Sequence, residues 1–340
     1  MLRIAVAALF VWVAWWNAAA AQWRDTPAVK ALHDAARQEG EVVLWGPQQR
    51  DLNWVARAFG AMFPGVAVRT LADADAAARI VTDSRTNTYV ADVLWTSLPA
   101  GAPAIQRSLA ATPDWSQFGV AEDDVAFDGR MAFTNNTVYV VAYSTDHAKD
   151  SDIPESWADF ADQRLAGKMA TSLYALPRLT AGLAQNWGEE RALQFTRDLV
   201  QRAEIMVTRG PRDGYLKSGE RPIALAELDG LARLWVGDGL PIRYKLPQPV
   251  VAAQYGVISL AHAPHPNAAL LLAGWLASPE GKAARERATG AIDYRPSSRN
   301  AAARALHARG VPFVFENAAD VRTRDALTER LTFLLSNVAR

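Results

Sequence analysis

Apolar and polar positions alternate along the first third of the chain in short blocks that predict helices and strands in turn. A helix is predicted over Thr26 to Glu39, because its apolar residues recur at helical spacing and Gly40 stands where a helix ends. The apolar run Glu41 to Trp45 then predicts a buried strand. The pattern continues with helices over Leu52 to Met62 and Asp73 to Thr82, and strands over Val66 to Thr70 and Ala91 to Trp95. This alternation predicts an α/β fold with a mostly parallel sheet covered by helices.

The longest apolar runs lie further along the chain. Thr137 to Asp146 is rich in β-branched and aromatic residues, which predicts a buried strand with α/β-patterned sequence on both sides. If those flanking segments build separate lobes, this strand crosses between them, and Val250 to Leu260 is a second run that carries the chain back. Two such crossings predict a hinge between the lobes. The cleft beside a crossing strand is a natural place for a ligand to bind.

The second half of the chain repeats the α/β pattern. The segment Ser172 to Thr180 is predicted to be a loop, with Thr180 as the N-cap of a helix that starts near Ala181. Further strands are predicted over Ile205 to Thr208 and Pro222 to Leu228, helices over Glu189 to Arg202 and Asp213 to Ser218, helical sequence from Pro266, and a C-terminal helix over Thr323 to Val338. The predicted lobes are residues 22–138 and 139–252, with 253–340 returning to the first lobe.

The N-terminus has the pattern of a secretory signal peptide over residues 1–21. A short positive start ending at Arg3 precedes the apolar run Ile4 to Trp16, and Ala19 to Ala21 provides a small-residue cleavage site. A membrane anchor is the alternative, but the run is shorter than the roughly 20 residues that span a bilayer. The chain has no cysteine, hence no disulfide and no lipid-anchored cysteine. We therefore expect a soluble periplasmic protein.

Composition narrows the class of partner. The 340 residues are half hydrophobic, which is enough for about two domains of ordinary size. Lys and Arg total 36 and Asp and Glu total 36, so no overall field attracts nucleic acid or an anionic membrane. We expect no nucleic-acid partner, no cofactor and a monomer.

Polar residues follow two of the predicted strands. Trp45 leads into a loop that contains Gln48, and Trp95 leads into Thr96 and Ser97. In parallel sheets, ligands bind beyond the carboxyl ends of the strands. Trp45 and Trp95 are candidates either for stacking platforms or for core residues, and the three polar side chains are candidate hydrogen-bond partners of a ligand.

Several segments together resemble a known family. They are, in order, EGEVVLWG, ADVLWTS, VYVVAYST, IPESWADF, LAGKMATS, VTRGPRDGYLKSGE, PIALAELD and LASPEGKAARERATG. This order resembles the extracellular solute-binding proteins of ABC importers, closest to the ferric-iron-binding type, over about residues 25–300. The resemblance implies a two-lobed periplasmic-binding-protein-like fold, each lobe a mixed or parallel sheet flanked by helices. It also implies closure on a small solute, which is presented to an ABC permease in the inner membrane.

The resemblance also implies a set of ligand-binding residues, carried over at matching positions only. They are Trp45, Gln48, Thr96, Ser97, Ser172, Arg178, Thr180, Arg209, Gly210, Glu227, Asp229, Gln254 and Tyr255. It implies no catalytic residue and no resident metal.

One departure from the iron-binding type bears on the ligand. Those members resemble one another in a twin-tyrosine motif shortly after the strand that here reads PIALAEL, where this chain has Leu228 and Asp229. No adjacent tyrosine pair occurs anywhere in the sequence. Ferric iron prefers hard oxygen ligands such as phenolate. Ferric-iron binding is therefore kept only as an alternative.

The remaining candidates carry both signs of charge. Arg178 and Arg209 would suit a carboxylate or phosphonate, while Glu227 and Asp229 would suit an ammonium group. An aromatic side chain such as Tyr255 would add a cation–π contact. A small organic ion, either an acid or a zwitterion, is the predicted solute.

Enzymatic motifs are absent from the sequence. There is no G-x-S-x-G elbow and no H-E-x-x-H pair, and the prolines around His262 and His265 prevent a regular helix that would place both on one face. PEGKAAR lacks the spacing of a phosphate-binding loop. The sequence thus predicts a binding protein without covalent chemistry. A sensor that reports the same closure to a signalling receptor is the second interpretation.

Overall fold

The computed structural model describes residues 23–46 and 52–338. The predicted signal peptide lies outside this part of the chain. The protein divides into two compact units: unit 1 comprises the chain up to Asn135 with Tyr255–Ala291, and unit 2 comprises Asn136–Gln254 with the chain from Ile292 onward. In this division the chain from Ile292 onward belongs to unit 2. The expected lobes, 22–138 and 139–252 with a return of 253–340 to the first, remain predictions.

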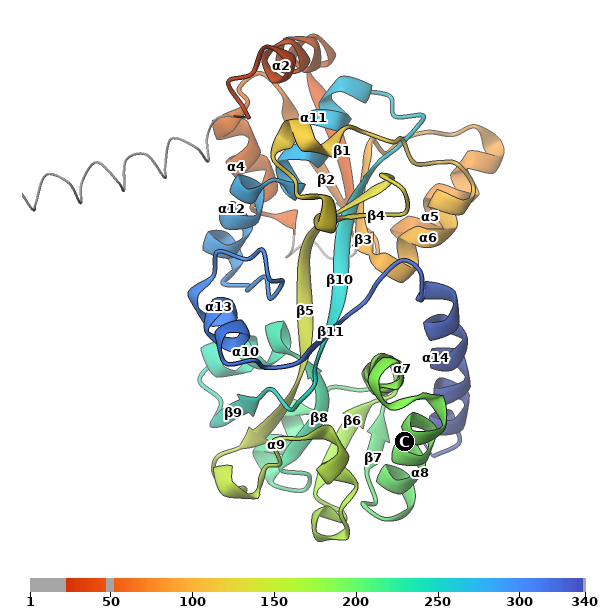
Figure 1. Ribbon diagram of the computed structural model, residues 1–340, viewed down its shortest axis with the longest axis vertical. Helices are drawn as coiled ribbons and strands as arrows, with labels where there is room; N and C mark the ends of the chain where they lie inside the picture. The colour runs from red at the N-terminus through yellow and green to blue at the C-terminus, as the bar shows by residue number, and fades with distance from the viewer. Residues whose placement is uncertain (1–22, 47–51, 339–340) are drawn as a thin grey trace, which may run out of the picture. The chain divides into compact units, whose positions relative to one another are not determined.

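Unit 1 is built on a mixed sheet in the order β2-β1-β3-β10. Strands β1, β2 and β3 are parallel to one another, and β10 runs antiparallel to β3. Its elements are α2 (Pro27–Glu39), β1 (Glu41–Gly46), α4 (Val55–Met62), β2 (Ala67–Ala72), α5 (Ala76–Asp83), β3 (Val93–Ser97), α6 (Leu98–Gln106), β4 (Val125–Ala126), the start of β5 (Met131–Ser144), the end of β10 (Val250–Ser259), α11 (Pro266–Ala277) and α12 (Pro279–Thr289). Figure 1 shows α4 and α12 on one side of these strands and α5 and α6 on the other.

Helix α11 supplies the centre of the unit 1 core. Trp275 is fully buried, and its ring lies 5.6 Å from that of Trp54 and 5.5 Å from that of Phe59, centroid to centroid. The helical stretch predicted from Pro266 is divided in two at Ser278, whose hydroxyl accepts the N–H of Gly281 and so caps α12. A Cβ on Gly281 would lie 1.9 Å from the carbonyl oxygen of Trp275, so this sharp turn requires glycine.

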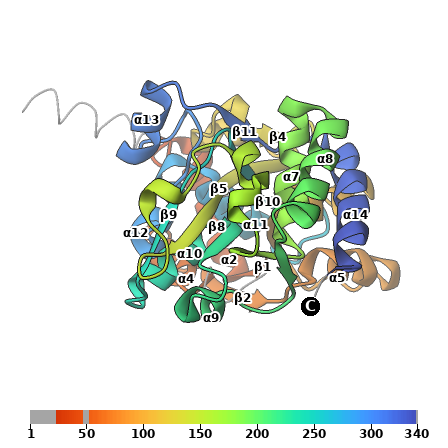
Figure 2. The same cartoon turned by 90° about the horizontal axis from the view of Figure 1, so that it is seen from below.

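Unit 2 has its sheet in the order β5-β8-β6-β7. Strand β6 is parallel to both β7 and β8, while β5 is antiparallel to β8 and to β9. Its further elements are β6 (Met169–Ser172), α7 (Ala175–Trp187), α8 (Glu189–Gln201), β7 (Met206–Thr208), α9 (Asp213–Ser218), β8 (Ile223–Leu228), α10 (Asp229–Gly237), β9 (Ile242–Lys245), α13 (Ala301–Ala308), β11 (Phe313–Phe315) and α14 (Val321–Ser336). Helices α7, α8 and α14 pack side by side, as Figure 2 shows.

Helix α7 begins six residues earlier than the sequence predicts. It starts at Ala175, and Thr180 is a buried residue inside it rather than its N-cap. Pro177 is tolerated because the first turn of a helix leaves its N–H groups without intrahelical partners, so a missing N–H removes no bond. The hydroxyl of Ser172 instead accepts the N–H groups of Tyr174 (3.1 Å) and Ala175 (3.3 Å).

The predicted central strand is present as β5, which continues from unit 1 into unit 2, as β10 does in the reverse direction. Its residues Val138, Val140 and Ala142 lie in the core of unit 2 together with Trp235. Within the described residues, no helix is both long and apolar enough to cross a membrane.

Candidate functional site

Three parallel strands of unit 2 end at the same edge of its sheet. Ser172 at the end of β6 pairs with Thr208 at the end of β7, and Thr171 pairs with Leu225 of β8. The register therefore brings the predicted candidates that follow these strands to one place. We name this place the carboxyl edge of unit 2. It comprises the segments Ser172–Tyr174, Thr208–Arg212 and Ala226–Asp229.

Glu227 is bound at this edge by an arginine that the sequence prediction did not include. Both of its oxygens accept from Arg212, at 2.5 Å from Nε and 2.7 Å from Nη2. The remaining terminal nitrogen of Arg212, Nη1, donates to the carbonyl of Gly210 at 2.8 Å. Only 1% of the Glu227 surface is exposed. Its charge is thus directed to Arg212 rather than outward.

Asp229 begins α10 and is enclosed by donors from three segments of unit 2. It accepts from the hydroxyl of Thr137 (2.6 Å) and the N–H of Val138 (3.2 Å), and it is paired with Arg233 one turn further along the helix. The hydroxyl of Tyr294 also donates to it, at 3.4 Å. This carboxylate joins β5, α10 and the segment before α13.

Burial and charge shift the pKa values of two partners of Asp229. Burial raises the pKa of the Tyr294 hydroxyl, and the negative charge of Asp229 raises it further. Burial alone would lower the pKa of Arg233, but the charge and hydrogen bond of Asp229 outweigh it and raise the value. Both partners therefore keep their protons throughout the physiological range.

The other predicted residues of unit 2 fall into two groups. Arg209 and Arg178 are exposed, the first directly after β7 and the second in the first turns of α7. Gly210 donates its N–H to the hydroxyl of Thr208 at 3.0 Å, so the side chain of Thr208 closes the turn that follows β7. Thr180, in contrast, faces Thr196 of α8 inside the core, which separates it from the carboxyl edge.

Gln254 belongs to a buried polar cluster of unit 2. Its N–H donates to Glu316 at 3.0 Å, and the same carboxylate accepts from Arg324 of α14 at 3.1 Å. Burial raises the pKa of Glu316 above its ordinary value, while the charge of Arg324 opposes the shift. The side-chain oxygen of Gln254 has no hydrogen-bond partner among the described residues. The sequence prediction missed Glu316 and Arg324.

In unit 1, strand pairing brings three predicted residues together. Ser97 at the end of β3 pairs with Tyr255 of β10, and Thr96 pairs with Gly256. Trp95 is a core residue whose indole N–H donates to Asn135 at 3.2 Å, in agreement with the core interpretation rather than the stacking one. Gln48 lies outside the described residues.

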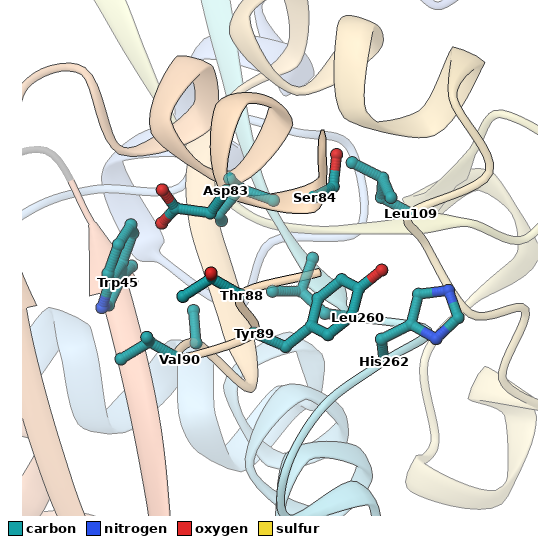
Figure 3. A pocket seen from close by; sticks show the side chains of 11 residues that line it. Trp45, Asp83, Ser84, Thr88, Tyr89, Val90, Leu109, Leu260 and His262 are labelled. Atoms are coloured by element: carbon teal, nitrogen blue, oxygen red, sulfur yellow. The ribbon is translucent and has the colours of Figure 1, made fainter. Parts of the chain in front are cut away.

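Trp45 lies in different surroundings from Ser97. Only 5% of it is exposed, and the guanidinium of Arg79 lies over its ring at 5.4 Å. It lines a mostly apolar pocket, shown in Figure 3, at whose other end Tyr89 and His262 lie beside each other. The pocket lies beside the residues that precede β3, Val90 among them, whereas Ser97 ends that strand.

Metal ligands do not gather anywhere in the described part of the chain. Residues 23–46 and 52–338 contain no group of three or more His, Asp or Glu side chains placed to hold a metal ion. His265, one of the two histidines in the proline-rich loop, is bound instead to Asp92, with 2.8 Å between Nδ1 and Oδ2.

Comparisons with known proteins agree with this architecture. Residues 54–310 match the family described as bacterial extracellular solute-binding protein. Among solved structures, iron-bound HitA from Pseudomonas aeruginosa is 20% identical, with a TM-score of 0.69, and covers 86% of this chain and 99% of its own. No curated protein matches the chain.

Two further solved structures are similar at 16% identity. An ABC transporter substrate-binding protein from Bradyrhizobium japonicum has a TM-score of 0.71 and covers 87% of this chain and 99% of its own. The Atu4243–GABA receptor has a TM-score of 0.68 and covers 86% and 96%. These likenesses confirm the predicted α/β fold of periplasmic binding proteins over most of the chain.

Proposed function

Because the chain belongs to the bacterial extracellular solute-binding protein family, we propose that it is a periplasmic receptor that closes on a small organic ion and delivers it to an ABC permease of the inner membrane. The family is one of solute-binding proteins of ABC transport and not of enzymes. What we propose beyond family membership is the periplasmic compartment, the small organic ion as solute and the monomeric state.

The observation that carries the proposal is the carboxyl edge of unit 2. Parallel strands direct the loops at their carboxyl ends to one side of a sheet, where ligands of α/β proteins bind. At this edge the chain places Arg209, Arg212 and Glu227, three charged side chains that a purely structural edge does not need. Charged groups in fixed positions suit a small organic ion.

Ferric iron is the alternative solute, since iron-bound HitA is among the similar structures. That likeness is one of fold alone, because the two chains share only 20% identity. Leu228 ends β8 and Asp229 follows it, so neither residue there is a tyrosine, and Asp229 is bound by Arg233. The proposal of an organic ion therefore stands ahead of iron.

The test is native mass spectrometry of the protein purified from the periplasm, before and after ejection of bound ligand. We expect the mass of a monomer beginning after Ala21, with a co-purified organic mass. An iron-sized mass would contradict the organic solute and support the alternative. Retention of residues 1–21 on a membrane-bound protein would contradict the periplasmic location.

A further inference from the structure

We propose that Arg212 binds the oxyanion of the solute, a carboxylate or a phosphonate, and that Glu227 positions Arg212 instead of binding the solute. The inference rests on the proposed receptor function and names the chemical class of its ligand. It reverses the sequence prediction for Glu227, which assigned that carboxylate to an ammonium group.

The hydrogen bonds of Arg212 leave part of its guanidinium unused. A guanidinium has five N–H donors, and Arg212 uses one from each of its three nitrogens, two toward Glu227 and one toward Gly210. One N–H on each of the two terminal nitrogens therefore has no acceptor among residues 23–46 and 52–338. The Arg212 side chain is 12% exposed, so it is accessible in part from outside.

The three bonds also fix the orientation of the guanidinium. Glu227 binds it side-on through two oxygens, and the Gly210 carbonyl holds a third point, so the plane cannot rotate. The N–H groups that remain on a guanidinium in a fixed plane can donate to the oxygens of a carboxylate or phosphonate. Such a pre-oriented donor pair loses little conformational entropy when it binds.

A strained residue immediately before Glu227 supports a positioning role. Ala226 lies inside β8 with φ of +62°, a left-handed conformation that an L-residue other than glycine rarely adopts. The pairing of β5 with β8 shifts register at this point, between Val140 and Ala142. Such irregularities redirect side chains and are concentrated beside functional sites. Here the irregularity directs Glu227 toward Arg212.

The carboxyl edge offers an ammonium group no available carboxylate. Both oxygens of Glu227 are occupied by Arg212, and Asp229 is enclosed by Arg233 and three further donors. An ammonium ion would have to displace an arginine from one of them. An oxyanion displaces nothing, and the exposed Arg209 adds a second positive charge nearby.

The experiment is a thermal-shift and calorimetric titration of the purified mature protein. The probes are benzoate and succinate for carboxylates, methylphosphonate for phosphonates, and putrescine as a purely cationic solute. We expect saturable binding of at least one anion and no binding of putrescine. Comparing the affinities for the carboxylates and for methylphosphonate identifies the preferred oxyanion. Binding of putrescine alone would overturn the inference and leave the receptor function intact.

Variants then test the assignment of roles. Arg212→Gln should weaken the anion about ten- to a hundredfold, which is the effect of losing a charged hydrogen-bonding group. Arg212→Lys, which keeps the charge without the planar fork, should recover only part of that loss. Glu227→Gln should retain anion binding within about tenfold, because the carboxylate only orients Arg212. The exposed Arg202→Gln is the matched control and should leave affinity unchanged.

Each alternative result has a defined meaning. Anion affinity that is equal in Arg212→Gln and the parent protein would overturn the role of Arg212, and so would the absence of binding by every anion. The receptor function is judged separately by native mass spectrometry. If Arg212→Gln fails to fold, as circular dichroism would reveal, Arg212→Lys provides the comparison.

Discussion

Glu227 and Asp229 stand two residues apart at the end of β8, and each is buried against an arginine. They differ in what else they bind. Asp229 has Thr137, Val138 and Tyr294 as further donors. Within the described part of the chain, the Glu227 carboxylate has only Arg212, which it holds at the carboxyl edge. Asp229, a carboxylate with several donors, joins segments of the fold. Glu227, a carboxylate bound by one arginine, leaves that arginine able to bind a solute.

The largest expected effect is on the free energy of unfolding when Asp229 is removed. Asp229→Ala leaves the half-buried Arg233 without its carboxylate partner, and it leaves Thr137, Val138 and Tyr294 without this acceptor. It should destabilise unit 2 by about 3–5 kcal/mol in urea unfolding. Glu227→Ala should cost less, about 1–3 kcal/mol, because it removes the carboxylate partner of Arg212 alone, and Arg212 keeps its hydrogen bond to the Gly210 carbonyl.

The exposed Asp238→Ala is the control for both and should stay within about 0.5 kcal/mol of the parent. Equal losses for Asp229→Ala and Glu227→Ala would show that the two pairs have the same structural role, which would break the comparison.

A second prediction concerns Ala226, the strained residue immediately before Glu227. Ala226→Val should lower the free energy of unfolding by about 2 kcal/mol, since a β-branched side chain is least compatible with a positive φ. Ala226→Gly should relieve the strain, keep or raise stability and preserve anion affinity. A strongly destabilised glycine variant would mean that the methyl group of Ala226, rather than its backbone, is what matters.

The third buried pair, Glu316 with Arg324, extends the comparison to pH. Burial raises the pKa of Glu316, so the folded protein binds more protons than the unfolded chain in and above the ordinary glutamate range. Stability should therefore fall as the pH rises through that window. Glu316→Gln should remove this part of the slope in thermal melts, while the exposed Glu190→Gln should leave it in place. If stability depended on pH in the same way in Glu316→Gln as in the parent protein, the raised pKa of Glu316 would be contradicted.

The sequence predicted the strands of the sheets better than the contacts of their polar residues. The apolar runs at Glu41, Ala91, Thr137 and Val250 became strands because burial requires such runs. The convergence of Ser172, Arg209 and Glu227 followed from the parallel order of β6, β7 and β8, which the alternation of strands and helices already implied.

The partners of these residues could not be predicted in the same way. Arg212 lies in the same loop as Arg209, and nothing local distinguishes the arginine that pairs with Glu227 from the one that remains exposed. The left-handed conformation of Ala226 has no sequence signal, because alanine is ordinary in a strand. Glu316, which also binds Arg324, meets Gln254 from more than sixty residues away. Such contacts depend on tertiary packing.

The most direct test of the central claim is a crystal structure of the protein purified with its own solute. Our account predicts that an oxyanion lies within hydrogen-bond distance of both terminal nitrogens of Arg212, with Glu227 still bound side-on to the same guanidinium. A solute cation bound directly to Glu227, with Arg212 displaced, would contradict it, as would a solute bound far from the carboxyl edge of unit 2.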